Sequence, residues 1–168
     1  VMHAEPNAAH KLLAGLEKDY AVSIITQNID DLHERGGSSR ILHLHGNILS
    51  MRSEKDETLR YPCHGDINIG DVAEDGAQLR PDIVWFEEAV PAIEEAANIT
   101  RTADVFVIIG TSLQVYPAAS LIDFVPKYCP KFLIDKVGVD HYGLHELIQI
   151  EKPATEGVKI LIEKLAEL

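Results

Sequence analysis

Two apolar segments of this chain end abruptly in small and polar residues, and this pattern restricts the folds open to it. Residues 21–25 (AVSII) lead into Thr26, Gln27, Asn28 and Asp30, and residues 104–109 (DVFVII) lead into Gly110, Thr111 and Ser112. Largely β-branched runs of this kind are typical of strands buried on both faces of a sheet. Because ligands bind beyond the carboxyl ends of such strands, the polar residues predict a binding edge.

The other segments alternate between strand and helix patterns. Further strands are expected at residues 41–44, 132–134 and 147–150, and an apolar segment covers residues 82–86. Helices are expected at residues 30–35, 92–103 and 118–125. Two further helices are expected to begin after N-caps at Asn7 and Thr155. The alternation predicts an α/β fold with a mostly parallel, doubly wound, Rossmann-like sheet covered on both faces.

Residues 52–80 interrupt this alternation because they are polar and contain several turn formers. They are expected to form a small subdomain inserted into one larger domain. That domain, of residues 1–51 and 81–168, would be the partial nucleotide-binding domain. The chain enters a helix pattern almost at its first residue, so we expect that an amino-terminal part of the protein, with the first strand of the sheet, lies outside it.

The composition limits the classes of function. At 168 residues and 46% hydrophobic, the chain can bury a full core. Its formal net charge of −12 argues against nucleic-acid binding but is compatible with a cationic peptide partner. Two cysteines give no disulfide framework, and no segment approaches the ~20 apolar residues of a membrane span, so a cytoplasmic location is expected.

Two histidines near the predicted binding edge are candidates for a base, because the unperturbed histidine pKa is about 6.5. Period-two spacing places His43 and His45 on one face of a strand that ends beside Gly46. Both could be ordinary structural histidines, and this interpretation is preferred for His43. His45 is favoured as a functional residue because the adjacent glycine lets a ligand approach the backbone closely.

Three further motifs allow a functional and a structural interpretation. Gly110, Thr111 and Ser112 suit phosphate or ribose oxygens, although turns of this kind often serve packing alone. Val84, Trp85 and Phe86 form either a core strand or an apolar lip for an extended peptide. Cys63 and His64 do not supply the four ligands of a structural zinc site, so no metal is expected.

Five motifs of the chain resemble those of the sirtuins, the NAD-dependent protein-lysine deacylases. They are PNAAH (6–10), TQNIDDLHERGG (26–37), LHLHGN (42–47), RPDIVWFEE (80–88) and GTSLQVYPAA (110–119), in the order found in the family. NIDDLHER and VYPAA are most similar to bacterial members. The resemblance implies an enzyme that uses NAD to remove acyl groups, most often acetyl, from protein lysines, with nicotinamide and O-acyl-ADP-ribose as products.

The resemblance also implies roles for individual residues. His45 would be the general base that deprotonates a ribose hydroxyl, with Asn28 as a second catalytic residue. The cofactor would be held at its nicotinamide and ribose end by Gln27, Asn28, Ile29, Asp30 and His45, and elsewhere by Gly110, Thr111, Ser112 and Asp135. The acyl-lysine tunnel would be lined by Val84, Trp85 and Phe86.

The chain departs from the family pattern in four places. The glycine-rich turn that precedes PNAAH in the family is not in this sequence. Ser53 and Asp56 stand where the first cysteine pair of the family's zinc ribbon occurs, so the subdomain is expected either to be held by packing and hydrogen bonds or to be partly disordered. Glu87 replaces a usual glycine, which either hinders peptide approach or attracts a cationic peptide. Asp135 replaces a usual asparagine and can accept a hydrogen bond from a ribose hydroxyl.

Two alternatives to a deacetylase remain open from the sequence. One is a related enzyme that prefers longer or acidic acyl groups or transfers ADP-ribose. The other is of a different class, a catalytically silent module that binds ADP-ribose or a peptide. Retention of His45, Asn28 and Asp30 favours an enzyme, whereas the missing glycine-rich turn favours silence for this chain alone.

Overall fold

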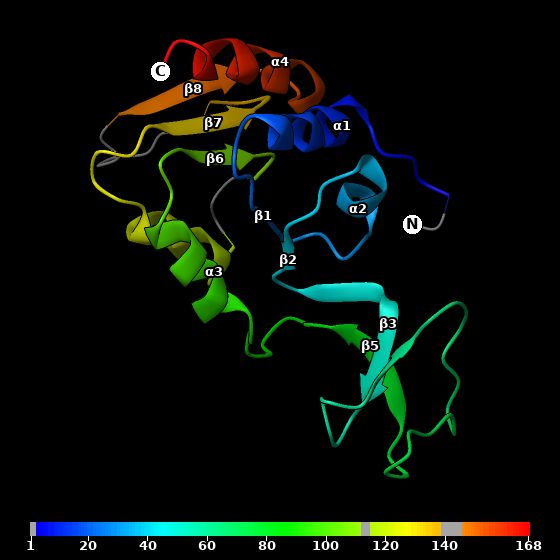
Figure 1. Ribbon diagram of the computed structural model, residues 1–168. Coiled ribbons are helices and arrows are strands. Elements are labelled where there is room, and N and C mark those ends of the chain that lie inside the picture. Colours follow the sequence, from blue (N-terminus) through cyan, green and yellow to red (C-terminus); the bar gives the residue numbers. More distant parts are fainter. Residues whose placement is uncertain (1–2, 112–114, 139–145) are drawn as a thin grey trace.

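The computed structural model describes residues 3–111, 115–138 and 146–168 (Figure 1). The helices are α1 (Ala8–Gly15), α2 (Leu32–Gly36), α3 (Ile93–Arg101) and α4 (Ala154–Leu165), and two 3₁₀ helices are η1 (Leu16–Lys18) and η2 (Ala118–Phe124). The strands are β1 (Ile24–Thr26), β2 (Ile41–His43), β3 (Gly46–Ser53), β4 (Arg60–Pro62), β5 (Leu79–Ile83), β6 (Phe106–Ile109), β7 (Lys131–Asp135) and β8 (Leu147–Glu151). None of the helices in these ranges combines the length and the apolar character required to cross a membrane.

The strands form two parallel sheets and one antiparallel sheet. β1 pairs with β2, and β6, β7 and β8 pair in that order, all in parallel. The antiparallel sheet has the order β4-β3-β5 and lies at the end of the molecule away from α4 (Figure 1). The predicted α/β class and the mostly parallel pairing are confirmed. The single sheet expected from the sequence is divided in two within the described residues.

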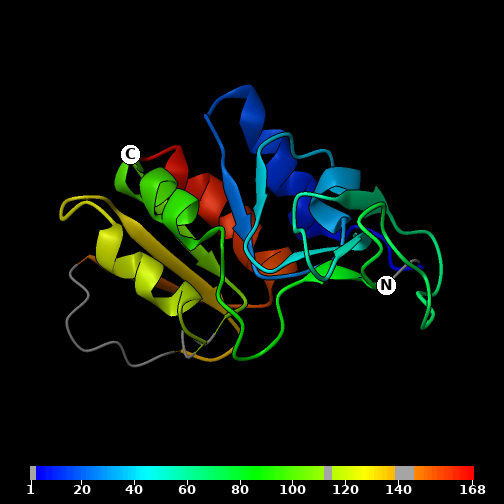
Figure 2. The same cartoon turned by 90° about the horizontal axis from the view of Figure 1, so that it is seen from below.

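Helices cover the parallel sheets on both faces, as a doubly wound fold requires. α1 and α4 pack over β7 and β8 through Ala9, Phe132, Ile134, Ile150, Val158 and Leu161. α3 and η2 pack around the end of β2 through Leu44, Ala96, Ala97, Ala118 and Leu121. Figure 2 shows β1 and β2 side by side, next to α1 and α2. These two cores hold the strand ends that the sequence identifies as a binding edge.

The ends of the helices are set by capping residues more closely than by the hydrophobic pattern. α1 begins at the predicted cap, where Asn7 Oδ1 accepts a hydrogen bond from Ala9 N at 2.8 Å. α2 is followed by the capping residue Gly37, whose φ of +104° suits glycine. The predicted cap at Thr155 is wrong, because the cap is Pro153, whose ring fixes φ near its observed −54°.

Two predicted elements are also shorter or tighter than expected. β1 starts at Ile24 because its parallel partner β2 begins only at Ile41, opposite that residue. η2 is a 3₁₀ helix that ends at Phe124, rather than an α-helix through residue 125. Its hydrogen bonds span three residues, as in the bond from Ser120 N to Pro117 O at 3.0 Å.

The antiparallel sheet is held by charged groups as much as by apolar ones. Arg52 is only 9% exposed, and its guanidinium lies 3.3 Å from Glu57 and 3.5 Å from Asp82. Arg60 reaches the second oxygen of Asp82 at 2.8 Å. Buried charges of this kind need their partners, since an unpaired one would be strongly destabilising. The sheet spans residues 46–83 and so begins and ends outside the polar segment 52–80.

Two histidines meet edge to face where α1 packs on α2. The ring centroids of His10 and His33 are 4.7 Å apart, and His33 Nδ1 is buried without a hydrogen-bond partner in the described residues. Burial lowers the pKa of both imidazoles, and for His33 the proximity of His10 lowers it further. The nearby acidic groups Asp30 and Glu34 oppose this shift without reversing it. The contact between α1 and α2 therefore favours neutral histidines.

Acidification should weaken the fold through this pair. The unfolded chain binds protons on its histidines near pH 6.5, about the unperturbed value, whereas folded His10 and His33 resist protonation. Their stabilisation is therefore present above that pH and is lost as the pH falls through it. We expect a lower urea midpoint at about pH 5.5 than at about pH 7.5, with a smaller difference in His33→Gln.

The exposed His3 provides a matched control for this prediction. His3→Gln removes one histidine without touching the interface between α1 and α2, so its pH dependence should equal that of the wild type. An equal pH dependence in His33→Gln and the wild type would show that the pair is not the source.

Candidate functional site

The loop after β1 is fastened to the segment after β2 by its own backbone carbonyls. Three successive carbonyl oxygens of the loop lie within hydrogen-bond distance of this segment: Gln27 O and His45 Nδ1 (3.1 Å), Asn28 O and His43 Nδ1 (3.4 Å), and Ile29 O and Ile48 N (2.8 Å). The two polar strand ends identified in the sequence therefore form one unit. Its two halves are joined by backbone carbonyls on one side and by two histidine rings and one backbone amide on the other.

Side chains of the same loop fix its turns. Thr26 is buried, and its Oγ1 accepts a hydrogen bond from Asn28 N at 3.1 Å, which turns the chain directly after the strand. Asp30 Oδ1 accepts from Leu32 N at 3.1 Å and so opens α2. Within the described residues, the side-chain amides of Gln27 and Asn28 have no hydrogen-bond partner, so their donors and acceptors are available to a ligand.

His43 and His45 differ in how many ring nitrogens are engaged. His43 Nε2 lies 2.6 Å from Glu34 Oε1, and its Nδ1 faces the Asn28 carbonyl. His45 Nδ1 faces the carbonyl of Gln27, which can only accept, so Nδ1 carries the proton and Nε2 keeps its lone pair. No partner for His45 Nε2 occurs among the residues described. Of the two, His45 is the one able to act as a base.

The predicted placement of both histidines on one strand is wrong. β2 ends at His43, and His45 lies in the two-residue turn that leads to β3. Gly46 follows with a φ of +80°, and a Cβ on it would lie 2.1 Å from Asp82 O. The turn can therefore pass β5 only with glycine at this position.

This close crossing brings the predicted peptide site beside the base. Val84 N donates to His45 O at 3.0 Å, directly after β5 ends at Ile83. The side chains of Trp85 and Phe86 are 53% and 94% exposed, so they are not part of a core strand. Exposed apolar side chains next to a strand end can line a groove for an extended peptide.

The second predicted group lies at the carboxyl ends of β6 and β7, which are neighbouring strands. Gly110 has a φ of +64°, and its N–H donates to Ile134 O at 2.9 Å. Asp135 ends β7, and its Oδ1 accepts from Val137 N at 3.2 Å, which leaves the other oxygen for a ligand. Thr111 directly follows Gly110, and Ser112 lies outside the described residues. Gly110 and Asp135 therefore share one sheet edge, as the sequence predicts.

Ser53 and Asp56, where a first cysteine pair was considered, belong to a hydrogen-bonded turn. Ser53 is fully buried, and its Oγ accepts from Lys55 N at 3.0 Å and from Asp56 N at 3.1 Å. The same hydroxyl donates to Asp75 Oδ2 at 2.7 Å, and Asp75 Oδ1 accepts from Ala77 N at 3.0 Å. We refer to this Ser53–Asp75 contact as the clasp. Its donor set lacks thiolate and imidazole and does not fit a structural zinc site.

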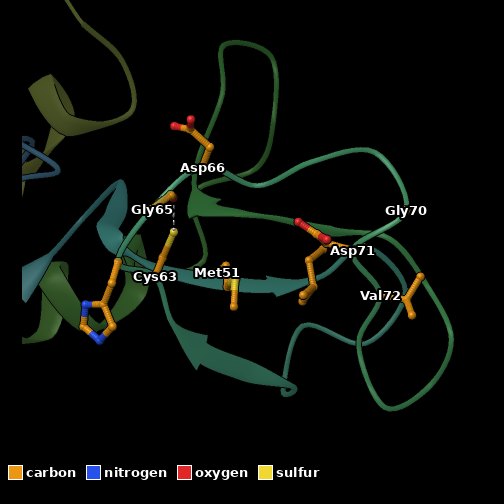
Figure 3. A pocket seen from close by; sticks show the side chains of 9 residues that line it. Met51, Cys63, Gly65, Asp66, Gly70, Asp71 and Val72 are labelled. Atoms are coloured by element: carbon orange, nitrogen blue, oxygen red, sulfur yellow. Dashed lines mark hydrogen bonds between the residues drawn. The ribbon is translucent and has the colours of Figure 1, made fainter.

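A shallow cavity of about 410 Å³ lies on the same antiparallel sheet (Figure 3). Cys63 lines it and donates its thiol proton to Gly65 O at 3.3 Å, while Asp66 and Asp71 lie well apart across it. In residues 3–111, 115–138 and 146–168, no three His, Cys, Asp or Glu side chains are placed to hold a metal ion. None of the predicted site residues lines this cavity.

Several contacts that shape the site are missed by sequence reasoning. They are the His43–Glu34 pair, the hydrogen bond from Val84 N to His45 O, and the pair between Arg80 and Glu88 at 2.7 Å. The charges of Arg80 and Glu88 on either side of an apolar run hint at the last one. An eight-residue spacing across an irregular turn has no periodicity that would reveal it.

Comparison with known proteins agrees with this geometry. The Sir2 family profile matches residues 1–117. The NAD-dependent protein deacylase of Helicobacter pylori is 53% identical over 163 residues, which cover 97% of this chain and 71% of the relative. The NAD-dependent protein deacylase of Bacteroides thetaiotaomicron is 47% identical, covering 98% of this chain and 73% of the relative.

Solved structures show the same fold. A Sir2 homolog–NAD complex matches with a TM-score of 0.84 and 30% identity, over 98% of this chain and 66% of that one. Sir2 bound to acetylated peptide matches with a TM-score of 0.80 and 29% identity, over 98% and 72% of the two chains. By its sequence and by its fold, this chain belongs to the Sir2 family.

Proposed function

We propose that this protein uses NAD to remove acyl groups, most often acetyl, from lysine side chains of proteins. The observation that carries the proposal is the pair of contacts made by His45. In the first, the Nδ1–H of His45 donates a hydrogen bond to Gln27 O. In the second, the backbone carbonyl of His45 accepts a hydrogen bond from Val84 N. A base with a free lone pair therefore stands between loop 26–30 and the apolar turn after β5. The relatives at 53% and 47% identity are named NAD-dependent protein deacylases.

His45 would act as the general base of the reaction. Attack by the acyl oxygen of the modified lysine on the nicotinamide ribose would break the bond from the ribose to nicotinamide. A ribose hydroxyl would then have to lose its proton before it could take up the acyl group. Nε2 of His45 is free to accept that proton, while the hydrogen bond from Nδ1 to Gln27 O stabilises the resulting imidazolium. Addition of one water molecule would then free the unmodified lysine, so the products are nicotinamide, O-acyl-ADP-ribose and that lysine.

The surrounding residues would position the two substrates. The free amides of Gln27 and Asn28, with Ile29 and Asp30, suit the ribose and the carboxamide of nicotinamide. Gly110, Thr111, Ser112 and Asp135 would hold the remaining ribose and phosphate groups at the edge of β6 and β7. Val84, Trp85 and Phe86 would surround the uncharged acyl-lysine, which needs an apolar tunnel.

The proposal is tested by incubating an acetyl-lysine peptide with the protein, with and without NAD, and following both products by mass spectrometry. We expect NAD-dependent loss of the acetyl group and formation of O-acetyl-ADP-ribose. His45→Ala should lower kcat by roughly 10²- to 10⁴-fold, the usual contribution of a positioned general base.

His3→Gln is the control, because His3 is an exposed histidine of α1's leading segment, remote in sequence from both strand ends. It should leave the rate unchanged. Equal rates in His45→Ala and the wild type would contradict the role of His45. Peptide and ADP-ribose binding without any turnover would instead support the silent binding module.

We also propose that the antiparallel sheet of this protein is held without zinc. The support is the clasp, in which the hydroxyl of buried Ser53 and the Asp75 carboxylate connect the turn at residues 53–56, where the family's first cysteine pair occurs, to the turn at residues 75–77. Its oxygen ligands bind zinc less well than cysteine does.

Metal analysis of the purified protein should therefore find less than one zinc per chain, and a chelator should not change Tm. Ser53→Ala should lower the free energy of unfolding by about 1–3 kcal/mol, because it removes the hydrogen bond to the Asp75 carboxylate and the acceptor of the Lys55 and Asp56 amides. Ser50→Ala is the matched control, since within the described residues the Ser50 hydroxyl makes a single long contact, 3.4 Å to Tyr61 O. One zinc bound per chain would refute the proposal.

A further inference from the structure

The turn after β5 is clamped by Glu88, and this leaves its neighbour Glu87 free. Glu88 N donates to Trp85 O at 3.1 Å, and Trp85 N donates back to Glu88 Oε2 at 3.0 Å. The same carboxylate forms a bidentate pair with Arg80 at 2.7 and 3.1 Å, and the Arg80 hydrogen bonds lower the pKa of Glu88. The charge of Glu88 is therefore compensated within the turn.

Glu87 adopts a backbone conformation that residues with a side chain rarely take. Its φ is +74°, in the left-handed region, where glycine carries no steric penalty but a Cβ does. Outliers of this kind cluster at ligand-binding turns, where the surrounding structure enforces them. Here the Glu88 clamp enforces the turn. The position therefore carries a carboxylate where the backbone alone would favour glycine.

The carboxylate of Glu87 has no cationic partner within the described part of the chain. The arginines of the antiparallel sheet are engaged elsewhere: Arg80 with Glu88, Arg52 with Glu57 and Asp82, and Arg60 with Asp82. Glu87 is exposed and directly follows Phe86, a residue that is itself 94% exposed. The turn after β5 thus presents exposed apolar side chains followed by one negative charge without a cationic partner among the described residues.

We propose that Glu87 makes this site prefer acyl-lysine peptides that carry a lysine or arginine beside the modified residue. This inference rests on the proposed function. Acylation removes the charge of the modified lysine itself, so a cation that pairs with Glu87 must come from a flanking residue. The formal net charge of −12 adds long-range attraction for such a peptide.

The test compares kcat/KM, with NAD, for three acetyl-lysine peptides whose flanking residues are lysine, glutamine or glutamate. We expect the wild type to favour the lysine-flanked over the glutamate-flanked peptide by roughly two- to fivefold, mainly through KM, as for an exposed ion pair. Glu87→Gln should reduce this ratio towards one, and Glu87→Lys should invert it. Salt at about 1 M should remove most of the wild-type preference.

Two further variants test whether the peptide preference comes from the charge at residue 87 rather than from the net charge or the stability of the protein. Glu163→Gln removes the same charge from the exposed side of α4 and should keep the wild-type preference. Glu87→Gly removes both the carboxylate and the unfavourable Cβ. It should therefore lose the preference while its Tm rises above that of the wild type.

The outcomes distinguish this inference from the proposed function. An equal ratio in the wild type and Glu87→Gln, with deacetylation intact, overturns the inference and leaves the deacylase standing. If no peptide is deacetylated, the equilibrium affinities of the same three peptides decide the question. An affinity that depends on the flanking charge, and loses that dependence in Glu87→Gln, supports the inference. An affinity that does not depend on it, or no binding, overturns it.

Discussion

The site depends on the hydrogen bonds by which the carbonyls of Gln27, Asn28 and Ile29 hold the segment from His43 to Ile48. These bonds join two strand ends into one rigid unit, and they also set the tautomer of His45. The backbone carbonyl of His45 then accepts a hydrogen bond from Val84 N, at the start of the turn after β5. Loop 26–30, His45 and the turn after β5 are therefore linked by backbone carbonyls and amides together with the rings of His43 and His45.

Much of the fold could be predicted from the sequence because its signals are local. Asn7 and Gly37 act through their own cap geometry, and the run of residues 104–109 is apolar enough to require burial. The division of the parallel sheet and the late start of β1 could not be predicted. They depend on which strand lies alongside and where that partner begins, which no local pattern encodes.

The candidate site shows the same contrast. The choice of His45 over His43 follows from the adjacent Gly46, and the structure gives a second reason in the engagement of His43 by Glu34. The exposure of Trp85 and Phe86 was one of two open interpretations in the sequence. What decides it is the Arg80–Glu88 clamp, a contact across an irregular turn that has no periodic signature.

The clasp between Ser53 and Asp75 determines which chemical stresses the antiparallel sheet can withstand. Peroxide and disulfide reagents attack thiolates, but they do not oxidise a hydroxyl or a carboxylate under the same conditions. Hydrogen bonds from Ser53 and Ala77 lower the pKa of Asp75, so the clasp is intact at neutral pH and is lost only when strong acid protonates that carboxylate. The contact between Ser53 and Asp75 is therefore sensitive to strong acid but not to oxidants.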